Sequence, residues 1–92
     1  MKQVTVKLRI SGRVQGVCFR HYTRETALAH GVNGWVRNCP DGSVEAVLQG
    51  EDTAVGSVIR WCHDGPSAAW VEKVEVTVPT EIESYQDFSV RH

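Results

Sequence analysis

The feature that most restricts the fold of this chain is the order in which its apolar residues change their spacing. Apolar side chains occupy every second position over residues 4–10, which is typical of a strand with one buried face. Residues 19–30 then contain neither Gly nor Pro, and side chains at Phe19, Thr23 and Ala27 recur at helical spacing before Gly31. The chain therefore begins with a strand followed by a helix.

The same alternation continues along the chain. Strands are predicted over residues 32–38 and 43–49, joined at Asp41-Gly42, because a type I′ hairpin turn needs residues that tolerate positive φ. The acidic pair Glu51-Asp52 suits the start of a second helix. One face of that helix is apolar at i, i+3, i+4 and i+7, namely Val55, Val58, Ile59 and Cys62.

Two further strands are predicted over residues 71–78 and, shorter, 84–91. The resulting order is βαββαβ plus a short C-terminal strand. Right-handed crossovers place both helices on one face of an antiparallel-containing sheet. The sequence thus predicts an α+β protein with the split βαβ, or ferredoxin-like, arrangement, and its length indicates a single domain over residues 1–92.

Composition excludes several classes of function. The formal net charge is −1 and the Lys and Arg residues are scattered, so a nucleic-acid partner is not expected. No segment approaches the roughly 20 apolar residues of a membrane span, and the N-terminus lacks the apolar centre of a signal peptide. The three cysteines, Cys18, Cys39 and Cys62, fit neither a disulfide framework nor a zinc site. We expect a cytoplasmic monomer with reduced thiols.

Residues 12–20, Gly-Arg-Val-Gln-Gly-Val-Cys-Phe-Arg, join the first strand to the first helix. A glycine-bracketed turn in this place can present a concave set of backbone N–H groups to an anion, and Arg20 adds a fixed cation at its rim. A tight turn without function is the simpler interpretation of two glycines. The candidate phosphate-binding loop comprises Gln15, Gly16, Val17, Cys18, Phe19 and Arg20, and its expected ligand is phosphate or sulfate.

Because this fold supports many functions, the site has to decide among them. An RNA-recognition module would need aromatic residues on its third strand, and residues 43–49 contain none. A metal carrier would need a Cys-x-x-Cys pair near the first loop, which is absent, and the four histidines share no ligand spacing. No metal or other cofactor is therefore expected. A non-catalytic module that binds anions remains an alternative.

Two segments of this chain resemble the signature motifs of the acylphosphatases. They are residues 12–20 (GRVQGVCFR) and residues 34–44 (GWVRNCPDGSV), and the similarity extends over nearly the whole chain. The resemblance implies a small cytosolic enzyme of ferredoxin-like fold that hydrolyses carboxyl–phosphate anhydrides without a metal. It also implies that Arg20 binds the phosphate group and that Asn38 positions the attacking water.

The chemistry of such a reaction agrees with these residues. The leaving carboxylate has a conjugate acid with a pKa of about 4, so no general acid is needed. A bidentate contact from Arg20 to the phosphate would contribute about 1.5–3 kcal/mol. The amide of Asn38 can hold water without titrating, although a local hydrogen bond within the turn is an equally good interpretation of the residue alone.

Cys18 departs from the family, in which an aromatic or small residue is common at this position. Cys18 and Arg24 have the Cys-x5-Arg spacing of cysteine-dependent phosphatases, but the intervening residues contain no glycine, so a wrapped phosphate loop is hard to form. Amide dipoles that attract phosphate would also make an exposed thiol more easily oxidised. Cys18 is therefore a candidate redox-sensitive residue as well.

Overall fold

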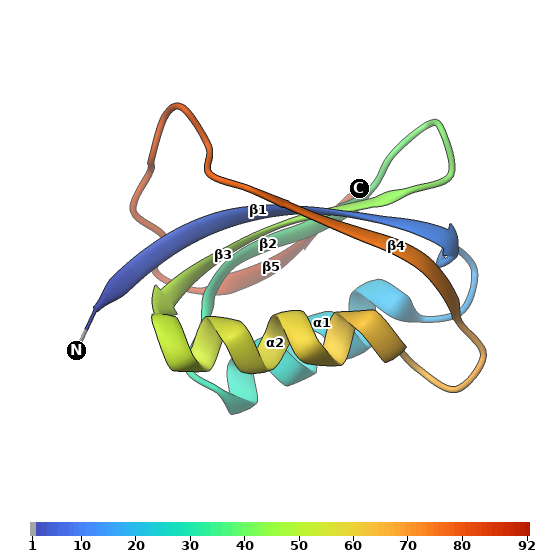
Figure 1. The fold of residues 1–92 in the computed structure, drawn as a ribbon, viewed down its shortest axis with the longest axis horizontal. Coiled ribbons are helices and arrows are strands. Elements are labelled where there is room, and N and C mark those ends of the chain that lie inside the picture. The colour runs from blue at the N-terminus through green and yellow to red at the C-terminus, as the bar shows by residue number, and fades with distance from the viewer. Residues whose placement is uncertain (1) are drawn as a thin grey trace.

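The computed structural model describes residues 2–92 and contains one five-stranded sheet with two helices packed on the same face (Figure 1). This arrangement confirms the predicted α+β, ferredoxin-like fold. The elements in chain order are β1 (Gln3–Arg13), α1 (Phe19–Ala29), β2 (Asn33–Asn38), β3 (Val44–Glu51), α2 (Asp52–Asp64), β4 (Trp70–Thr77) and β5 (Phe88–Arg91).

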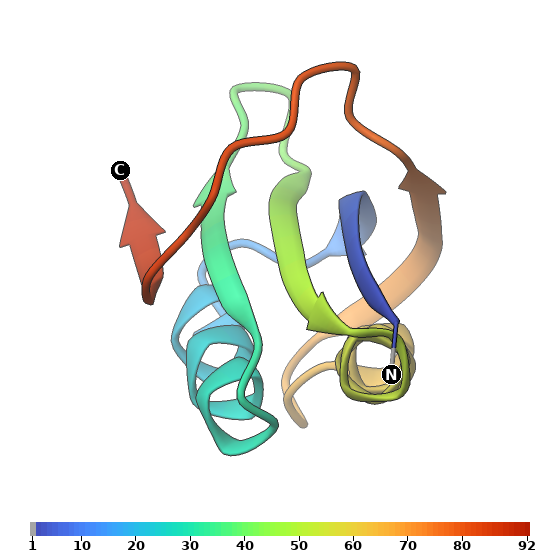
Figure 2. The same ribbon diagram turned by 90° about the vertical axis from the view of Figure 1, so that its left-hand side faces the viewer.

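The strands lie in the order β4-β1-β3-β2-β5, so β4 and β5 form the two edges (Figure 2). The pairs β1–β3, β1–β4 and β2–β3 are antiparallel, whereas β5 runs parallel to β2. Because β5 runs parallel to β2, the two strands end at the same side of the sheet. The last residues of the chain therefore lie near the end of β2, where Asn38 is located.

The core lies between the sheet and the helices. Leu8 and Ile10 of β1 are fully buried, as the alternating pattern predicts. Phe19, Thr23 and Ala27 form the buried face of α1, and the buried face of α2 is Val55, Val58 and Cys62. Burial raises the pKa of the Cys62 thiol to about 12, so this thiol stays protonated and acts as a small apolar side chain.

Several predicted boundaries shift by one or two residues, since β2 begins at Asn33, β3 spans Val44–Glu51 and β4 spans Trp70–Thr77. Helix α1 ends at Ala29 rather than at His30, which is exposed, and Gly31 follows with a φ of 69°. Strand β5 begins at Phe88 rather than at residue 84. The backbone before β5 is bound by the amide of Gln49, which donates to the Glu83 carbonyl at 2.6 Å and accepts from the Tyr85 N–H at 2.9 Å. At residues 83 and 85 these side-chain hydrogen bonds stand in place of the backbone hydrogen bonds that a strand would make.

The predicted hairpin between β2 and β3 is present, but the type I′ geometry is wrong. That turn requires positive φ at both central residues, and within residues 2–92 Cys18 is the only non-glycine residue with a positive φ. The Cys39 N–H donates to the Ser43 carbonyl at 2.8 Å, so residues 40–42 form a three-residue connection with Gly42 at φ 95°. The side chain of Asp41 closes it by accepting from the Ser43 N–H and hydroxyl.

The face of the sheet opposite the helices carries a buried carboxylate. The Glu45 side chain on β3 is only 5% exposed and lies 2.7 Å from Arg37 and 3.2 Å from Lys7. Burial acts to raise the pKa of Glu45, but hydrogen bonds from Arg37 and Lys7 and their positive charges outweigh it, so the pKa lies below its ordinary value of 4.5. Hydrogen bonds from Ser43 lower the pKa of Asp41 as well.

Acid should weaken the fold through Glu45. A carboxyl whose pKa is depressed in the folded state stabilises it above the unfolded pKa, and this contribution is lost as the pH falls from 4.5 through the folded value. Since the cations are half-exposed, we expect Glu45→Gln to lower the free energy of unfolding by about 1–2 kcal/mol at neutral pH. The difference should shrink below about pH 4 in urea titrations. An undiminished difference in acid would contradict this account.

Candidate active site

A cavity of about 490 Å³ opens at the end of the sheet where β1 leads into α1. Its walls come from four parts of the chain, namely the segment between β1 and α1, the first turn of α1, the last residue of β2, and β5. The lining residues are Val14, Gly16, Cys18, Phe19, Arg20, His21, Asn38 and Val90. The size is within the range of small-molecule sites. The two predicted catalytic residues, Arg20 and Asn38, thus line the same cavity.

The backbone of the loop before α1 has an unusual conformation. Gly16 has a φ of 75°, and Cys18, at the N-cap of α1, has a φ of 62° and a ψ of 25°. Left-handed residues in such a segment turn successive N–H groups toward a common point, where they can bind an anion. The free N–H groups at the start of α1 open at the same place. For a non-glycine residue this conformation costs about 1–2 kcal/mol, which Cys18 incurs.

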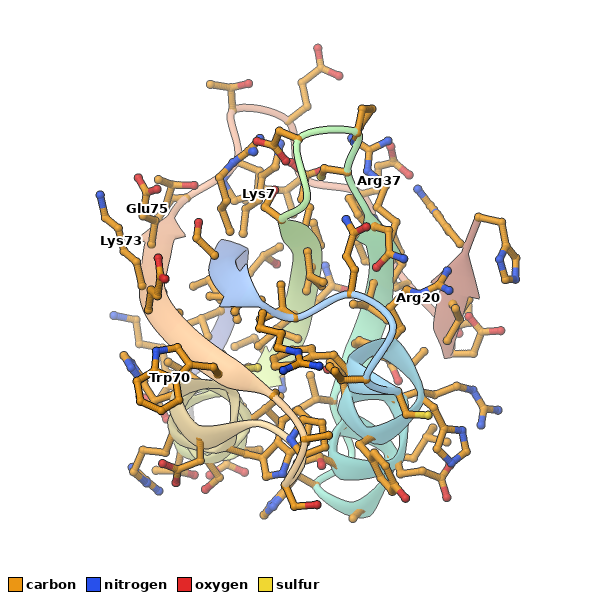
Figure 3. All side chains as sticks on the ribbon, turned by 90° about the vertical axis from the view of Figure 1, so that its right-hand side faces the viewer. Lys7, Arg20, Arg37, Trp70, Lys73 and Glu75 are labelled. Carbon is orange, nitrogen blue, oxygen red and sulfur yellow. The ribbon has the colours of Figure 1, made fainter. Side chains whose placement is uncertain are left out.

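Arg20 lies in the first turn of α1, between that helix and β5 (Figure 3). Its Nη1 donates to the Arg91 carbonyl at 3.3 Å and lies 3.4 Å from Nδ1 of His92. Within residues 2–92 these are the polar contacts of the guanidinium, and both use the same nitrogen. Because a guanidinium carries five N–H donors, the rest of the fork is free for a bidentate contact with an oxyanion.

Asn38 is the last residue of β2 and pairs with Val44 of β3. Its Oδ1 is buried, and among residues 2–92 it is the only buried side-chain nitrogen or oxygen without a hydrogen-bond partner. An unpaired buried acceptor costs about 1–3 kcal/mol. An asparagine at this position could have made a hydrogen bond within the turn, but in the structure Asp41 makes the bond in the turn instead. Asn38 therefore carries an unpaired acceptor in a side chain that lines the cavity.

The predicted phosphate loop divides into two groups. Gly16, Cys18, Phe19 and Arg20 line the cavity, whereas Gln15 and Val17 do not. Val17 packs against the core. The Gln15 side chain extends to the turn after β2, where its Nε2 donates to the carbonyls of Cys39 and Ser43, each at 2.8 Å. The loop is therefore tied directly to the segment that follows Asn38.

The structure does not bring Cys18 and Arg24 together in one site. Arg24 lies outside the cavity on the exposed side of α1, where it pairs with Glu25 at 3.4 Å. The residues between Cys18 and Arg24 form the first turns of a helix instead of wrapping around an anion. The geometry of a cysteine-dependent phosphatase loop is thus absent from this segment.

Sequence reasoning missed the contribution of the C-terminal strand to this site. Val90 lines the cavity, and the Arg91 carbonyl and the His92 ring contact Arg20. No residue type marks a backbone carbonyl as a partner, and the parallel pairing of β5 with β2 is not visible in a sequence pattern. His21 also lines the cavity, and its position directly after Arg20 was the one available signal.

Within residues 2–92, no three side chains of His, Cys, Asp or Glu lie close enough together to hold a metal ion. Neither helix in this part of the chain has the length and apolar character needed to cross a membrane.

Comparisons with known proteins show which family the chain resembles. The acylphosphatase family model matches residues 6–90. An acylphosphatase of Rubrobacter xylanophilus is 55% identical over 94% of this chain and 78% of its own length. The crystal structure of an acylphosphatase from Bacillus subtilis superposes with a TM-score of 0.92 at 30% identity, over 99% of this chain and all of the other.

An acylphosphatase from Coxiella burnetii has a similar structure, with a TM-score of 0.91 and 36% identity over 97% of this chain and 93% of the other. The motif residues and the residues that line the cavity all lie within the range matched by the family model. With a family model covering residues 6–90 and relatives this similar over more than three quarters of their own lengths, the chain belongs to the acylphosphatase family.

Proposed function

We propose that this enzyme hydrolyses the carboxyl–phosphate anhydride of acyl phosphates, giving a carboxylate and inorganic phosphate, by direct attack of water. One observation carries the proposal. The unpaired, buried Oδ1 of Asn38 belongs to a side chain that lines the same cavity as Arg20 and the left-handed loop. A phosphate-binding loop beside an unpaired hydrogen-bond acceptor that does not titrate suits a reaction between a phosphoryl group and water.

Binding of the phosphoryl group involves the loop and Arg20. Backbone N–H groups from residues 15–20 donate to the phosphate oxygens, and the guanidinium neutralises their charge. The negative charge on those oxygens changes during phosphoryl transfer, and donors that are fixed in advance stabilise it without reorganisation. The loop and Arg20 therefore serve both binding and turnover.

Asn38 acts on the other reactant. Its Oδ1 accepts a hydrogen bond from a water and holds that water in line with the bond to the leaving carboxylate. The water oxygen forms the new bond to phosphorus, the bond between phosphorus and the carboxylate oxygen breaks, and that oxygen keeps the electron pair. The proton of the water passes to a phosphate oxygen. Since a carboxylate leaves readily, no acid is required.

The proposal extends to the state of the enzyme. We propose that it acts as a single domain and a monomer, without a metal, in the cytoplasm. Its three cysteines are unpaired, as expected in a reducing compartment. The charge neutralisation that a metal would supply is assigned here to Arg20 and the amide groups.

The test is incubation of the purified protein with an aromatic acyl phosphate in the presence of EDTA, followed by ultraviolet absorbance as the anhydride is cleaved. Steady hydrolysis that EDTA does not diminish is the expected result. Binding of inorganic phosphate without any hydrolysis would favour the alternative, a non-catalytic anion-binding module. Loss of activity on adding EDTA, with recovery on adding a divalent cation, would contradict the metal-free mechanism.

Variants of Cys18 test both its conformation and its chemistry. Cys18→Gly should raise the free energy of unfolding by about 1 kcal/mol, because glycine adopts the left-handed backbone at no steric cost. Cys18→Ser keeps the strain and should leave stability within about 0.5 kcal/mol.

Both variants of Cys18 should retain most hydrolysis, and both should resist peroxide if oxidation of this exposed thiol inhibits the parent. Near-complete loss of activity in both variants would indicate a nucleophilic cysteine.

A further inference from the structure

Gln15 joins the two halves of the cavity through its side chain. Its Nε2 has two N–H bonds, and it donates to the Cys39 carbonyl and the Ser43 carbonyl, both at 2.8 Å. The residue belongs to the loop that precedes α1, while both acceptors belong to the turn between β2 and β3. This part-buried bridge spans 24 and 28 residues of sequence.

The two carbonyls already have backbone partners. The Cys39 carbonyl accepts from the Gly42 N–H at 3.1 Å, and the Ser43 carbonyl accepts from the Cys39 N–H at 2.8 Å. Each oxygen has two lone pairs, so the bonds from Gln15 complete the capacity of both. A side chain with fewer than two donors at this position would leave at least one of the two carbonyls with its backbone partner alone.

The bridge is attached next to Asn38 and next to its partner across the sheet. Cys39 directly follows Asn38, the last residue of β2, and Ser43 directly precedes Val44, the residue paired with Asn38. Gln15 itself directly precedes Gly16, which lines the cavity. A displacement of the turn between β2 and β3 would therefore move Asn38 relative to the phosphate-binding loop.

We propose that Gln15 is a positioning residue for the reaction, which holds Asn38 at a fixed distance from the phosphate loop so that the water and the phosphorus stay in line. The inference rests on the proposed function. Gln15 does not line the cavity, and it acts through Asn38. Its side chain is thereby assigned a different task from the backbone N–H groups of the same loop, which bind the phosphate.

Gln15→Glu is the most direct variant, because it keeps the shape of the side chain and replaces the amide by a carboxylate. An ionised carboxylate cannot donate a hydrogen bond to either carbonyl. We expect kcat to fall by about 10- to 100-fold, the effect of a displacement on the order of 1 Å in an aligned site. Gln15→Met removes the donors without adding charge and should lower kcat to a similar degree. In this variant the inhibition constant of inorganic phosphate should stay within about twofold, since the loop amides and Arg20 are unchanged and no negative charge is added beside them.

A double-mutant cycle with Asn38→Ala separates positioning from general loosening. If Gln15 acts through Asn38, Gln15→Glu should cost less than about threefold in kcat once Asn38 is alanine. Arg9→Ala is the matched control, because Arg9 holds the same turn from the other face of the sheet, through Asp41 at 2.8 Å and Ser43 at 3.0 Å. That variant should keep kcat within about twofold while its urea midpoint falls.

The same assays distinguish the possible failures. A parent protein without hydrolytic activity would overturn the proposed function and this inference with it. With an active parent, three results would overturn the inference alone. They are an equal loss of kcat from Gln15→Glu in both backgrounds, a loss of phosphate binding in Gln15→Met as large as its loss of kcat, and a loss of kcat in Arg9→Ala matching that in Gln15→Met.

Discussion

Replacing Arg20 by glutamine should lower kcat/KM by about 10- to 100-fold and should weaken competitive inhibition by inorganic phosphate to a similar degree. A bidentate contact from a guanidinium to an oxyanion contributes about 1.5–3 kcal/mol, and the free part of the Arg20 fork can make such a contact. Because the phosphate group is present in the substrate, the transition state and the product, binding and turnover should decline together. The measurement is steady-state hydrolysis with phosphate as inhibitor.

Two controls make this result specific. Arg20→Lys keeps the positive charge but loses the planar fork, so it should recover only part of the phosphate affinity. Arg24→Gln, one turn further along α1 and outside the cavity, should leave hydrolysis and inhibition unchanged. Unaltered inhibition by phosphate in Arg20→Gln would mean that the phosphate group binds elsewhere.

Asn38→Ala should lower turnover without weakening the binding of phosphate, unlike Arg20→Gln. We expect kcat to fall by about 100- to 10,000-fold while the phosphate inhibition constant changes by less than about twofold, because the amide contacts the water and not the phosphate. Initial rates at saturating substrate give kcat, and titration with inorganic phosphate gives the inhibition constant, so the two effects are measured separately. Comparable losses of binding and turnover would refute the division of labour between Arg20 and Asn38.

The stability of the same variant strengthens the test. The Oδ1 of Asn38 has no hydrogen-bond partner within residues 2–92, so truncation to alanine breaks no hydrogen bond between this oxygen and the protein. Asn38→Ala should therefore unfold in urea at a concentration close to that of the parent. A large loss of activity without a loss of stability is the pattern expected of a group retained for function.

The sequence predicted those parts of the molecule that depend on neighbouring residues. The alternation in residues 4–10 indicates β1, and the i, i+3, i+4, i+7 pattern of residues 55–62 indicates α2, because each pattern reflects burial of a single face. The meeting of Arg20 with Asn38 in one cavity also agrees with the two motifs and the predicted topology.

Other parts depend on contacts that residue types do not encode. Cys18 adopts a left-handed backbone that a pattern would assign only to glycine or asparagine. The side chain of Gln15 binds carbonyls more than twenty residues away, and Arg20 is oriented by the Arg91 carbonyl. The turn after β2 avoids the type I′ geometry, since the φ of Pro40 is fixed and a third residue enters the loop.

The edge position of β5 links catalysis to local unfolding. This strand has four residues, pairs only with β2, and supplies the carbonyl that orients Arg20 and a wall of the cavity. Short edge strands open with a smaller free energy than the central strands of a sheet. Fraying of the last residues of β5, Val90 and Arg91, would release the guanidinium while Phe88 at the start of the strand stays packed in the core. On gentle heating or in dilute denaturant, catalysis should therefore fail before the tryptophan and circular-dichroism signals of the native state are lost.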